Sequence, residues 1–238
     1  VKKIYAIESG MSADPQMLWR LKENVNIVSF SDAHSFWPWR LGREATIFDL
    51  NELSYDNITK AIRTGNGLKG TIEVPPDYGK YHIDGHRLCN FCCDYKESMR
   101  LKKICPKCKK ELTIGVEYRI EELAKEKKEY KPETSREVIE VVPLHELISS
   151  VYDIKQLDSK KVWEIYNLLI KNFKNEFNVL LNVKEEELKK VVNEKLAKVI
   201  LLNREEKLSI KAGFDGVYGS IILNEEYKIK TQKSLGEF

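Results

Sequence analysis

The sequence predicts an α/β domain, a small zinc-binding module and a helical domain, in that order along 238 residues. Short apolar strands alternate with helix-forming segments in residues 1–78, which is typical of α/β folds. All five cysteines lie between Cys89 and Cys108, and apolar residues with helical spacing begin after Pro143. An apolar content of 42% and a charged content of 32% are typical of a soluble globular protein with a buried core.

The α/β segment, residues 1–78, contains four apolar runs with the composition of strands. These runs cover residues 4–7, 26–30, 45–50 and 68–74. Helices are expected over residues 14–21 and 54–63, with Gly65 ending the second helix. Because strands and helices alternate, the segment predicts a largely parallel sheet.

The start of the chain and its cysteine usage indicate a compartment. The first residues are charged too early for a signal peptide, and the apolar strand beside them predicts that the chain begins inside a domain. No apolar run approaches the length needed to span a membrane. Thiols that cluster in one place indicate a reducing compartment, so we expect the protein in the cytoplasm. The net charge of +3 permits a nucleic-acid partner without requiring one.

The zinc-binding module is assigned to residues 79–124, because its cysteines form two close groups. These groups are Cys89, Cys92 and Cys93, followed by Cys105 and Cys108. Two close thiol pairs separated by a short loop are typical of structural zinc sites, and buried thiols or a disulfide are the alternative. A closed site with four protein ligands stabilises a fold and does not activate water.

The ligands of this expected zinc site are partly fixed by the spacing. Cys105 and Cys108 would form one half of the site, and Cys89 would belong to the other half. His86 precedes Cys89 by three residues, which gives a second half-site of His-x-x-Cys form. The fourth ligand stays open among Cys92, Cys93 and His86.

The C-terminal part of the chain predicts a charged connector followed by helices. Residues 125–142 are charged and contain proline, which indicates an exposed loop. Residues 143–238 are assigned to a helical domain that ends in a β-hairpin. Apolar residues with helical spacing predict helices over residues 144–151, 159–170 and 184–202. Glycines within residues 208–223 predict the hairpin.

An aspartate and a histidine follow the expected strand at residues 26–30. Asp32 and His34 therefore lie on a loop that projects toward the catalytic face of an α/β barrel. Both side chains suit hydrolytic zinc, manganese or iron sites. The alternative is an ordinary turn, because Asp-x-His is a common triplet.

Two tryptophans interleaved with two arginines follow this loop. Trp37, Trp39, Arg40 and Arg43 could stack on bases and pair with phosphates of a nucleic acid. In the alternative, both tryptophans pack at the rim of the barrel and Arg43 pairs with the neighbouring Glu44. The spacing alone does not decide between these interpretations.

Longer segments of the sequence resemble one known family. They include residues 8–17, 31–44, 79–87, 104–108, 112–116, 143–146 and 213–219. In this order they resemble the archaeal endonuclease Q family, starting inside its PHP (polymerase and histidinol phosphatase) domain. The resemblance implies part of a PHP (β/α) barrel in residues 1–78, a zinc ribbon-like insert, and C-terminal helices with a terminal hairpin.

The resemblance also implies a function. The family consists of DNA-repair nucleases that cut the backbone on the 5′ side of deaminated bases, such as uracil and hypoxanthine, or at abasic sites. Asp32 and His34 correspond to the closing ligands of its metal cluster, which would hold zinc, manganese or magnesium for metal-assisted hydrolysis. The tryptophan and arginine loop, together with Arg87, would lie near the DNA. The same cleft would be faced by Glu8, Ser12 and Asp14.

The chain departs from the family at its active site. PHP enzymes open with a His-x-His motif, and none of the four histidines here forms one. Because two ligands are too few for a multinuclear site, we expect catalysis to need the missing N-terminal half of the barrel as a partner. Alone, the chain would be a non-catalytic, zinc-containing DNA-binding fragment, whose lysines and Arg87 bind phosphate. A PHP-type small-molecule phosphoesterase is a second alternative, against which the aromatic loop and the added modules argue.

Overall fold

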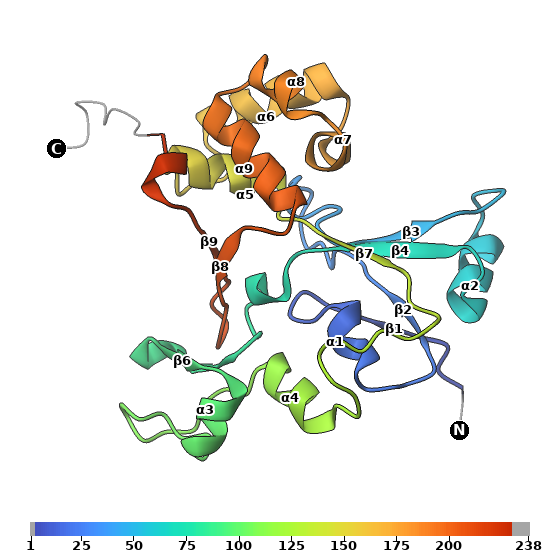
Figure 1. The fold of residues 1–238 in the computed structure, drawn as a ribbon, viewed down its shortest axis with the longest axis vertical. Coiled ribbons are helices and arrows are strands. Elements are labelled where there is room, and N and C mark those ends of the chain that lie inside the picture. The colour runs from blue at the N-terminus through green and yellow to red at the C-terminus, as the bar shows by residue number, and fades with distance from the viewer. Residues whose placement is uncertain (1–2, 230–238) are drawn as a thin grey trace. The chain divides into compact units, whose positions relative to one another are not determined.

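The computed structural model describes residues 3–229, whose helices and strands are shown in Figure 1. The chain divides into two compact units. The first unit combines the segment up to Phe36 with Arg40–Glu140 and Ile210–Ser220. The second unit combines Trp37–Trp39 with Val141–Ser209 and the segment after Ser220. The two tryptophans thus group with the C-terminal helices, whereas most of the expected connector and hairpin group with the α/β part.

Two sheets form the α/β part of the first unit. In one sheet, β1 (Ala6–Glu8) pairs in parallel with β2 (Asn26–Val28). In the other sheet, β4 (Leu68–Glu73) lies between β3 (Ala45–Phe48) and β7 (Glu137–Glu140). The pairing of β4 is antiparallel with β3 and parallel with β7.

The antiparallel pairing of β3 and β4 is an exception to the expected largely parallel arrangement, whereas β1 with β2 and β4 with β7 pair in parallel. The amide of Asp49 donates to the carbonyl of Gly67 at 2.8 Å, so the end of β3 lies beside the start of β4. The helix between them, α2 (Tyr55–Thr64), therefore returns to the end of the sheet that it left and does not cross it. Ser54 caps this helix and Gly65, with φ of 77°, ends it, as the sequence predicts.

The first strand and the first helix form close to their expected positions. β1 begins at Ala6, whereas the expected strand began at Ile4, whose side chain is exposed. Helix α1 (Pro15–Trp19) begins where expected, because Asp14 Oδ1 accepts a hydrogen bond from the amide of Met17 at 2.6 Å. Apolar side chains from the strands and α2 make a small core, formed by Ala6, Val28, Phe48, Leu50, Ala61, Ile62 and Leu68.

The connector expected over residues 125–142 is not a simple exposed loop, because it contains β7. Arg136 precedes this strand and donates to the carbonyls of Leu68 and Gly65, each at 3.0 Å. These bonds hold the connector against β4. The sequence signal was the pair of adjacent β-branched residues inside β7, which the surrounding charged residues obscure.

Short elements build the part of the first unit that carries the cysteines. They are η1 (Pro76–Tyr78), β5 (Asp84–His86), η2 (Arg87–Cys89), β6 (Phe91–Cys93), α3 (Tyr95–Arg100) and α4 (Val116–Leu123). Strands β5 and β6 pair in an antiparallel ladder. The amide of Ile83, just before β5, donates to the carbonyl of Gly213 at 3.2 Å. A Cβ at Gly85 would collide with the ring of Phe214, so this close approach requires glycine.

The residues that approach β5 belong to the tip of a C-terminal hairpin. Its strands, β8 (Ser209–Lys211) and β9 (Ser220–Ile222), pair with each other. The tip, residues 212–219, also bonds to the turn before β5, because the amide of Gly219 donates to the carbonyl of Tyr78 at 3.0 Å. The tip therefore packs on the cysteine-bearing part of the first unit.

Helices form the second unit, as the sequence predicts. They are α5 (Leu144–Tyr152), α6 (Lys160–Phe173), α7 (Glu176–Leu181), α8 (Glu185–Lys189) and α9 (Glu194–Arg204), followed by the short η3 (Glu225–Tyr227). The expected inward face of α5 is confirmed, since Leu144, Leu147, Ile148 and Val151 are fully buried. Ser159 caps α6 with its hydroxyl, also as expected.

The third expected helix, residues 184–202, is wrong as a single helix. The chain forms α8 and α9 with a break between them, because Asn193 Oδ1 accepts a hydrogen bond from the amide of Lys195 at 2.9 Å and starts a new helix. Helix α7 was not predicted, although Asn175 caps it in the same manner. In both places an asparagine cap marked a boundary that the apolar spacing did not.

Candidate functional site

Four side chains of the cysteine-bearing part bring their ligand atoms to one place. Atoms of His86, Cys89, Cys105 and Cys108 all lie within 4.8 Å of one another. The sulfur of Cys108 lies 3.3 Å from Nδ1 of His86. Within residues 3–229, this group is where at least three His, Cys, Asp or Glu side chains converge closely enough to hold a metal ion. We call these four residues the metal cluster.

Two tight turns build the metal cluster. His86 ends β5 and Cys89 ends the single 3₁₀ turn that follows it. Asn90 then turns the chain into β6 in the left-handed region, at φ of 44°. The second turn is closed by a hydrogen bond from the amide of Cys105 to the carbonyl of Lys110 at 2.7 Å. Local backbone geometry therefore presents two ligands from each turn.

Cys92 and Cys93 lie outside the metal cluster, and for Cys92 the register of β5 and β6 gives the reason. Cys92 is opposite Gly85 and Cys93 is opposite Asp84. Side chains alternate along a strand, so Cys92 points to the face away from His86. Burial and the nearby Asp84 carboxylate raise the pKa of the Cys93 thiol to about 12, which keeps that thiol protonated. Of the three candidates that the sequence left open, the structure brings His86, and not Cys92 or Cys93, to the other three residues.

The thiols of the metal cluster have shifted pKa values. Burial opposes ionisation of Cys105, but hydrogen bonds from the amides of Cys108 and Lys107 outweigh it and lower the pKa of Cys105 to about 6. A hydrogen bond to Cys108 and burial raise the pKa of Cys89 to about 11. Three thiolates at these separations repel one another, and a bound cation removes that repulsion. The donor set therefore fits a metal ion.

Contacts from distant segments hold the metal cluster in place. Asp215, in the hairpin tip, accepts hydrogen bonds from the amide of Arg87 and from Oγ1 of Thr113, each at 2.6 Å. Lys107 Nζ donates to the carbonyl of Cys89 at 2.8 Å. The turn that carries His86 and Cys89 is consequently fixed from two sides.

The predicted metal ligands Asp32 and His34 lie together on an exposed loop after β2. Nε2 of His34 is 3.4 Å from Oδ2 of Asp32, and both side chains are more than three-quarters exposed. Ser31 anchors the base of the loop, since its hydroxyl donates to the carbonyl of Glu44 at 3.0 Å and accepts from the amide of Gly42 at 2.7 Å. The pair is available to solvent, but in the described residues it lacks a third His, Cys or carboxylate ligand close by.

The two tryptophans predicted to stack on bases instead pack within the second unit. Their rings stack on each other, with centroids 5.0 Å apart and planes within 7°. Trp39 is 7% exposed and also contacts His145 and Trp163, at centroid distances of 4.8 and 6.3 Å. Its faces are therefore covered by residues of the helical unit and not at the barrel rim that the packing interpretation named, and base stacking by Trp39 does not fit. Trp37 stays partly exposed.

The predicted DNA-binding arginines differ in their exposure. Arg43 is buried and its Nε donates to the carbonyl of Ser31 at 3.0 Å. Its guanidinium therefore supports the loop at Ser31, and the alternative pairing with Glu44 is absent from the ion pairs of the described residues. Arg40 lies over the ring of Tyr218 at 5.5 Å and is partly exposed. Arg87 is exposed and so remains able to reach a ligand.

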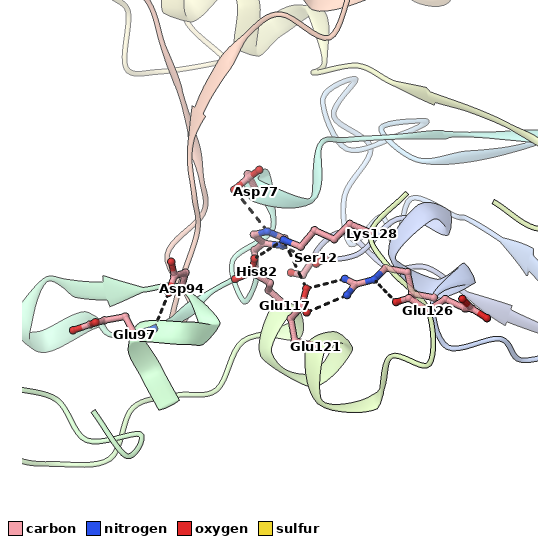
Figure 2. Close-up of polar contacts among 10 residues, drawn as sticks. Ser12, Asp77, His82, Asp94, Glu97, Glu117, Glu121, Glu126 and Lys128 are labelled. Carbon is pink, nitrogen blue, oxygen red and sulfur yellow. Dashed lines mark hydrogen bonds and ion pairs between the residues drawn. The ribbon is translucent and has the colours of Figure 1, made fainter. Parts of the chain in front are cut away.

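A network of polar contacts near α1 and α4 contains residues that the sequence suggested only loosely. In Figure 2, His82 lies between Ser12 and Asp77, with Nδ1 3.0 Å from the Ser12 carbonyl and Nε2 3.7 Å from Asp77 Oδ1. Close by, Arg20 donates two hydrogen bonds to Glu121, at 2.8 and 3.0 Å. These contacts tie segments together, so we assign Ser12 a structural role. Asp14 is equally structural as the α1 cap, while Glu8 is exposed.

Two buried glutamates near the Asp32–His34 loop were not predicted as site residues, although the sequence suggested Glu44 as a partner of Arg43. Glu44 and Glu73 are 2% and 0% exposed. Glu73 ends a mostly buried strand, and this position was the signal in the sequence that could have revealed it. Acidic side chains are seldom buried without a partner, so a carboxylate in a buried strand indicates a site.

Comparisons with known proteins find one matching domain family and similar solved structures. Residues 143–207 match a family model described as the MJ0043 C-terminal domain. The crystal structure of the lesion-specific endonuclease PfuEndoQ from Pyrococcus furiosus is similar with a TM-score of 0.82 and 34% identity, over 94% of this chain and 56% of that one. The chain is endonuclease Q-like. It corresponds to a C-terminal portion of the endonuclease Q fold.

A second solved structure and two curated proteins are also similar to this chain. An endonuclease Q structure with a 27-mer duplex substrate, carrying an abasic lesion at the active site, has a TM-score of 0.84 at 34% identity over 94% of this chain and 57% of that one. The uncharacterized protein MJ0043 of Methanocaldococcus jannaschii is 34% identical over 227 residues, and YqxK of Bacillus subtilis is 29% identical over 224. Each alignment covers 92% of this chain, but 28% of MJ0043 and 52% of YqxK. The endonuclease Q-like chain thus spans about half, or less, of its relatives.

None of the helices within residues 3–229 combines the length and the apolar character that crossing a membrane requires.

Proposed function

We propose that this chain contributes to a DNA-repair nuclease of the endonuclease Q type, which cleaves the phosphodiester backbone on the 5′ side of deaminated bases or at abasic sites. The observation that carries the proposal is the match at a TM-score of 0.84 to endonuclease Q bound to duplex DNA with an abasic lesion. Residues 1–78 would form the C-terminal part of the PHP barrel. Residues 79–124 would be the zinc-binding module, joined by a connector at 125–142 to a helical domain at 143–238.

Asp32 and His34 would be the chain's contribution to the catalytic centre. Both are exposed and 3.4 Å apart on a loop whose base is held by Ser31. Zinc, manganese or magnesium bound there would generate hydroxide and neutralise charge on the phosphate. Two ligands cannot hold a multinuclear centre, so we propose that an N-terminal barrel segment supplies the others. The chain's own role is to fix the loop, through Ser31 and Arg43.

The metal cluster would hold a structural zinc ion. Three sulfurs and one imidazole nitrogen are ligands that zinc prefers, and four protein ligands leave no position open for water. On this proposal the zinc ion ties the turn at His86 and Cys89 to the turn at Cys105 and Cys108. Its role is to stabilise the fold and to hold Arg87 where it can reach DNA.

A reconstitution assay tests the nuclease proposal. Uracil-, hypoxanthine- or abasic-site DNA is incubated with Mn²⁺ or Mg²⁺ and the chain, with and without the N-terminal PHP segment of an endonuclease Q. We expect cleavage 5′ of the lesion in the reconstituted sample alone, and its loss in Asp32→Asn and His34→Ala. Asp49→Asn, another exposed aspartate of the first unit, is the matched control. If the reconstituted pair binds lesion DNA but never cuts it, the proposal fails.

A non-catalytic DNA-binding role is the second candidate, and the isolated Asp32–His34 pair favours it. In this role Arg40, Arg87 and Trp37 would contact the DNA backbone and bases. Affinity for lesion DNA should fall steeply with rising salt, because phosphate contacts release counterions. Arg87→Ala should weaken binding and flatten the salt dependence, whereas Arg119→Ala, an exposed arginine on α4, should not. An affinity that is constant from low to high salt would exclude phosphate contacts.

A further inference from the structure

Two glutamate side chains face each other inside the first unit. The register of β3 and β4 pairs Ala45 with Ile72, so Glu44 and Glu73 are the next opposite residues along the ladder. Opposite residues of antiparallel strands place their side chains on the same face of the sheet. Both glutamates are buried in the described chain itself, with exposures of 2% and 0%. Two acidic side chains are therefore buried next to each other.

The two carboxylates differ in their hydrogen bonding. Glu73 accepts hydrogen bonds from the hydroxyls of Ser29, at 2.8 Å, and Ser9, at 3.1 Å. Both oxygens of Glu44 are buried and accept no hydrogen bond. Ser29 also lies close to Glu44. A hydroxyl has only one proton with which to donate a hydrogen bond, and Ser29 donates that bond to Glu73.

Arg43 is the neighbouring cation: burial and Glu73 raise the pKa of Glu44, and the charge of Arg43 offsets that rise only in part. Its Nε donates to the carbonyl of Ser31, and its Nη1 is buried without a hydrogen bond. No ion pair within the described residues joins Arg43 to Glu44 or Glu73, and a carboxylate without a partner is strongly disfavoured in the interior. Burial favours the neutral Glu44 carboxyl when no ion has been added, but both of its oxygens then stay without a hydrogen-bond partner. A bound cation satisfies both carboxylates at once.

We propose that Glu44 and Glu73 hold a divalent metal ion with oxygen ligands, of the class of Mg²⁺ and Mn²⁺. Hydroxyl oxygens complete the donor set: Ser9 and Ser29 already contact Glu73, and buried Thr71 lies on the same face of β4 two residues away. These donors contain neither sulfur nor nitrogen, so they suit a hard cation and contrast with the metal cluster. The site differs from the Asp32–His34 pair, which is exposed.

The position of the site suggests what the ion would do. The carbonyl of Glu44 accepts a hydrogen bond from the hydroxyl of Ser31. This bond anchors the loop that carries Asp32. Ser29, which directly follows β2, donates a hydrogen bond to Glu73. An ion between the glutamates would brace both ends of this short segment. It would thereby position the loop without contacting Asp32 or His34.

Binding of Mn²⁺ to the zinc-loaded chain tests the proposal, with free Mn²⁺ counted by electron paramagnetic resonance. We expect Glu44→Gln and Glu73→Gln each to bind one Mn²⁺ fewer than the wild type. The double variant Asp32→Asn/His34→Ala should retain this ion, which separates the buried site from the exposed pair. Mn²⁺ should also raise the Tm of the wild type and not that of Glu44→Gln. Equal Mn²⁺ binding by wild type and by both folded glutamine variants would overturn the proposal.

The pH dependence of Mn²⁺ binding gives an independent readout. Burial raises the pKa of Glu44 to about 8 and that of Glu73 to about 7. Because both carboxyls are largely protonated below pH 7, the ion must displace a proton from each, and its affinity should rise by well over tenfold, up to about a hundredfold, per pH unit between pH 6 and 7. Exposed carboxylates ionise near pH 4, so the Mn²⁺ affinity of a site made of them would not change with pH in this range. If Glu44→Gln does not fold, Glu44→Asp should bind Mn²⁺ at least about tenfold more weakly, and unchanged affinity there would equally overturn the site.

Discussion

Asp215 Oδ2 accepts a hydrogen bond from the backbone amide of Arg87 at 2.6 Å, although 128 positions separate the two residues in sequence. The same carboxylate accepts the hydroxyl of Thr113 at 2.6 Å. Because Arg87 directly follows His86, this contact fixes the orientation of the first turn of the metal cluster. The hairpin tip therefore acts as a support for a site to which it contributes no ligand.

The support by Asp215 can be measured as metal affinity. We expect Asp215→Ala to lower Zn²⁺ affinity about 10- to 100-fold, because residues that orient ligands have effects of this size. Competition with a chromophoric chelator measures the change. Asp153→Ala is the matched control, since Asp153 also adopts a left-handed conformation but lies at the end of α5 in the second unit. Equal affinities of the two variants would show that Asp215 has no part in positioning the ligands.

The identity of the fourth ligand can be tested by metal stoichiometry. We expect Cys108→Ser and His86→Ala to lose the bound zinc, and Cys92→Ser to retain one ion per chain, because Cys92 faces away from His86 in the strand register. Release by a thiol-modifying reagent with a colorimetric zinc indicator measures the content. Cys93→Ser serves as a second control outside the metal cluster. A zinc-free Cys92→Ser together with a zinc-loaded His86→Ala would restore the all-cysteine ligand set.

The sequence predicted three of the four cluster ligands but left the last one open. The spacing alone identifies Cys105 and Cys108, because the two residues between these cysteines fit one tight turn. The choice of His86 over Cys92 depends on how β5 pairs with β6, since a shift of one residue reverses the face of every side chain. Register of a three-residue strand is set by its neighbours, and here one neighbour is Phe214, far along the chain.

The aromatic loop shows the same limit. Trp37 and Trp39 are two residues apart, so the sequence could pair them with each other, but not with a partner more than 100 residues away. Helix α6 supplies that partner, Trp163, and α5 supplies His145. The helices themselves were predictable from their apolar spacing and from the Ser159 cap. Their packing partners were not, because burial of a polar ring such as His145 has no local signal.

Stability of the first unit should depend on pH through the buried glutamates when no divalent ion has been added. Their raised pKa values mean that the folded state binds more protons than the unfolded state above about pH 4.5. The free energy of unfolding should therefore fall as pH rises from about 5 to 8, by at most about 1.4 kcal/mol per pH unit for each proton. Urea denaturation at four pH values measures this slope. Glu44→Gln should flatten it, whereas Glu52→Gln, at an exposed position, should not, and identical slopes in both variants would remove Glu44 as the cause.

Trp39 should matter for the stability of the second unit and not for base recognition. Its ring is buried between Trp37 and the pair His145 and Trp163, so Trp39→Ala opens a large cavity and should lower the free energy of unfolding by about 3–5 kcal/mol. Trp39→Phe should recover part of this loss, because a smaller aromatic ring refills some of the volume. Urea denaturation measures both variants, and fluorescence anisotropy with lesion DNA measures binding by the folded Trp39→Phe. Unchanged affinity is expected for Trp39→Phe, since no face of the ring is free for a base; a large loss of affinity with intact stability would return Trp39 to the DNA interface.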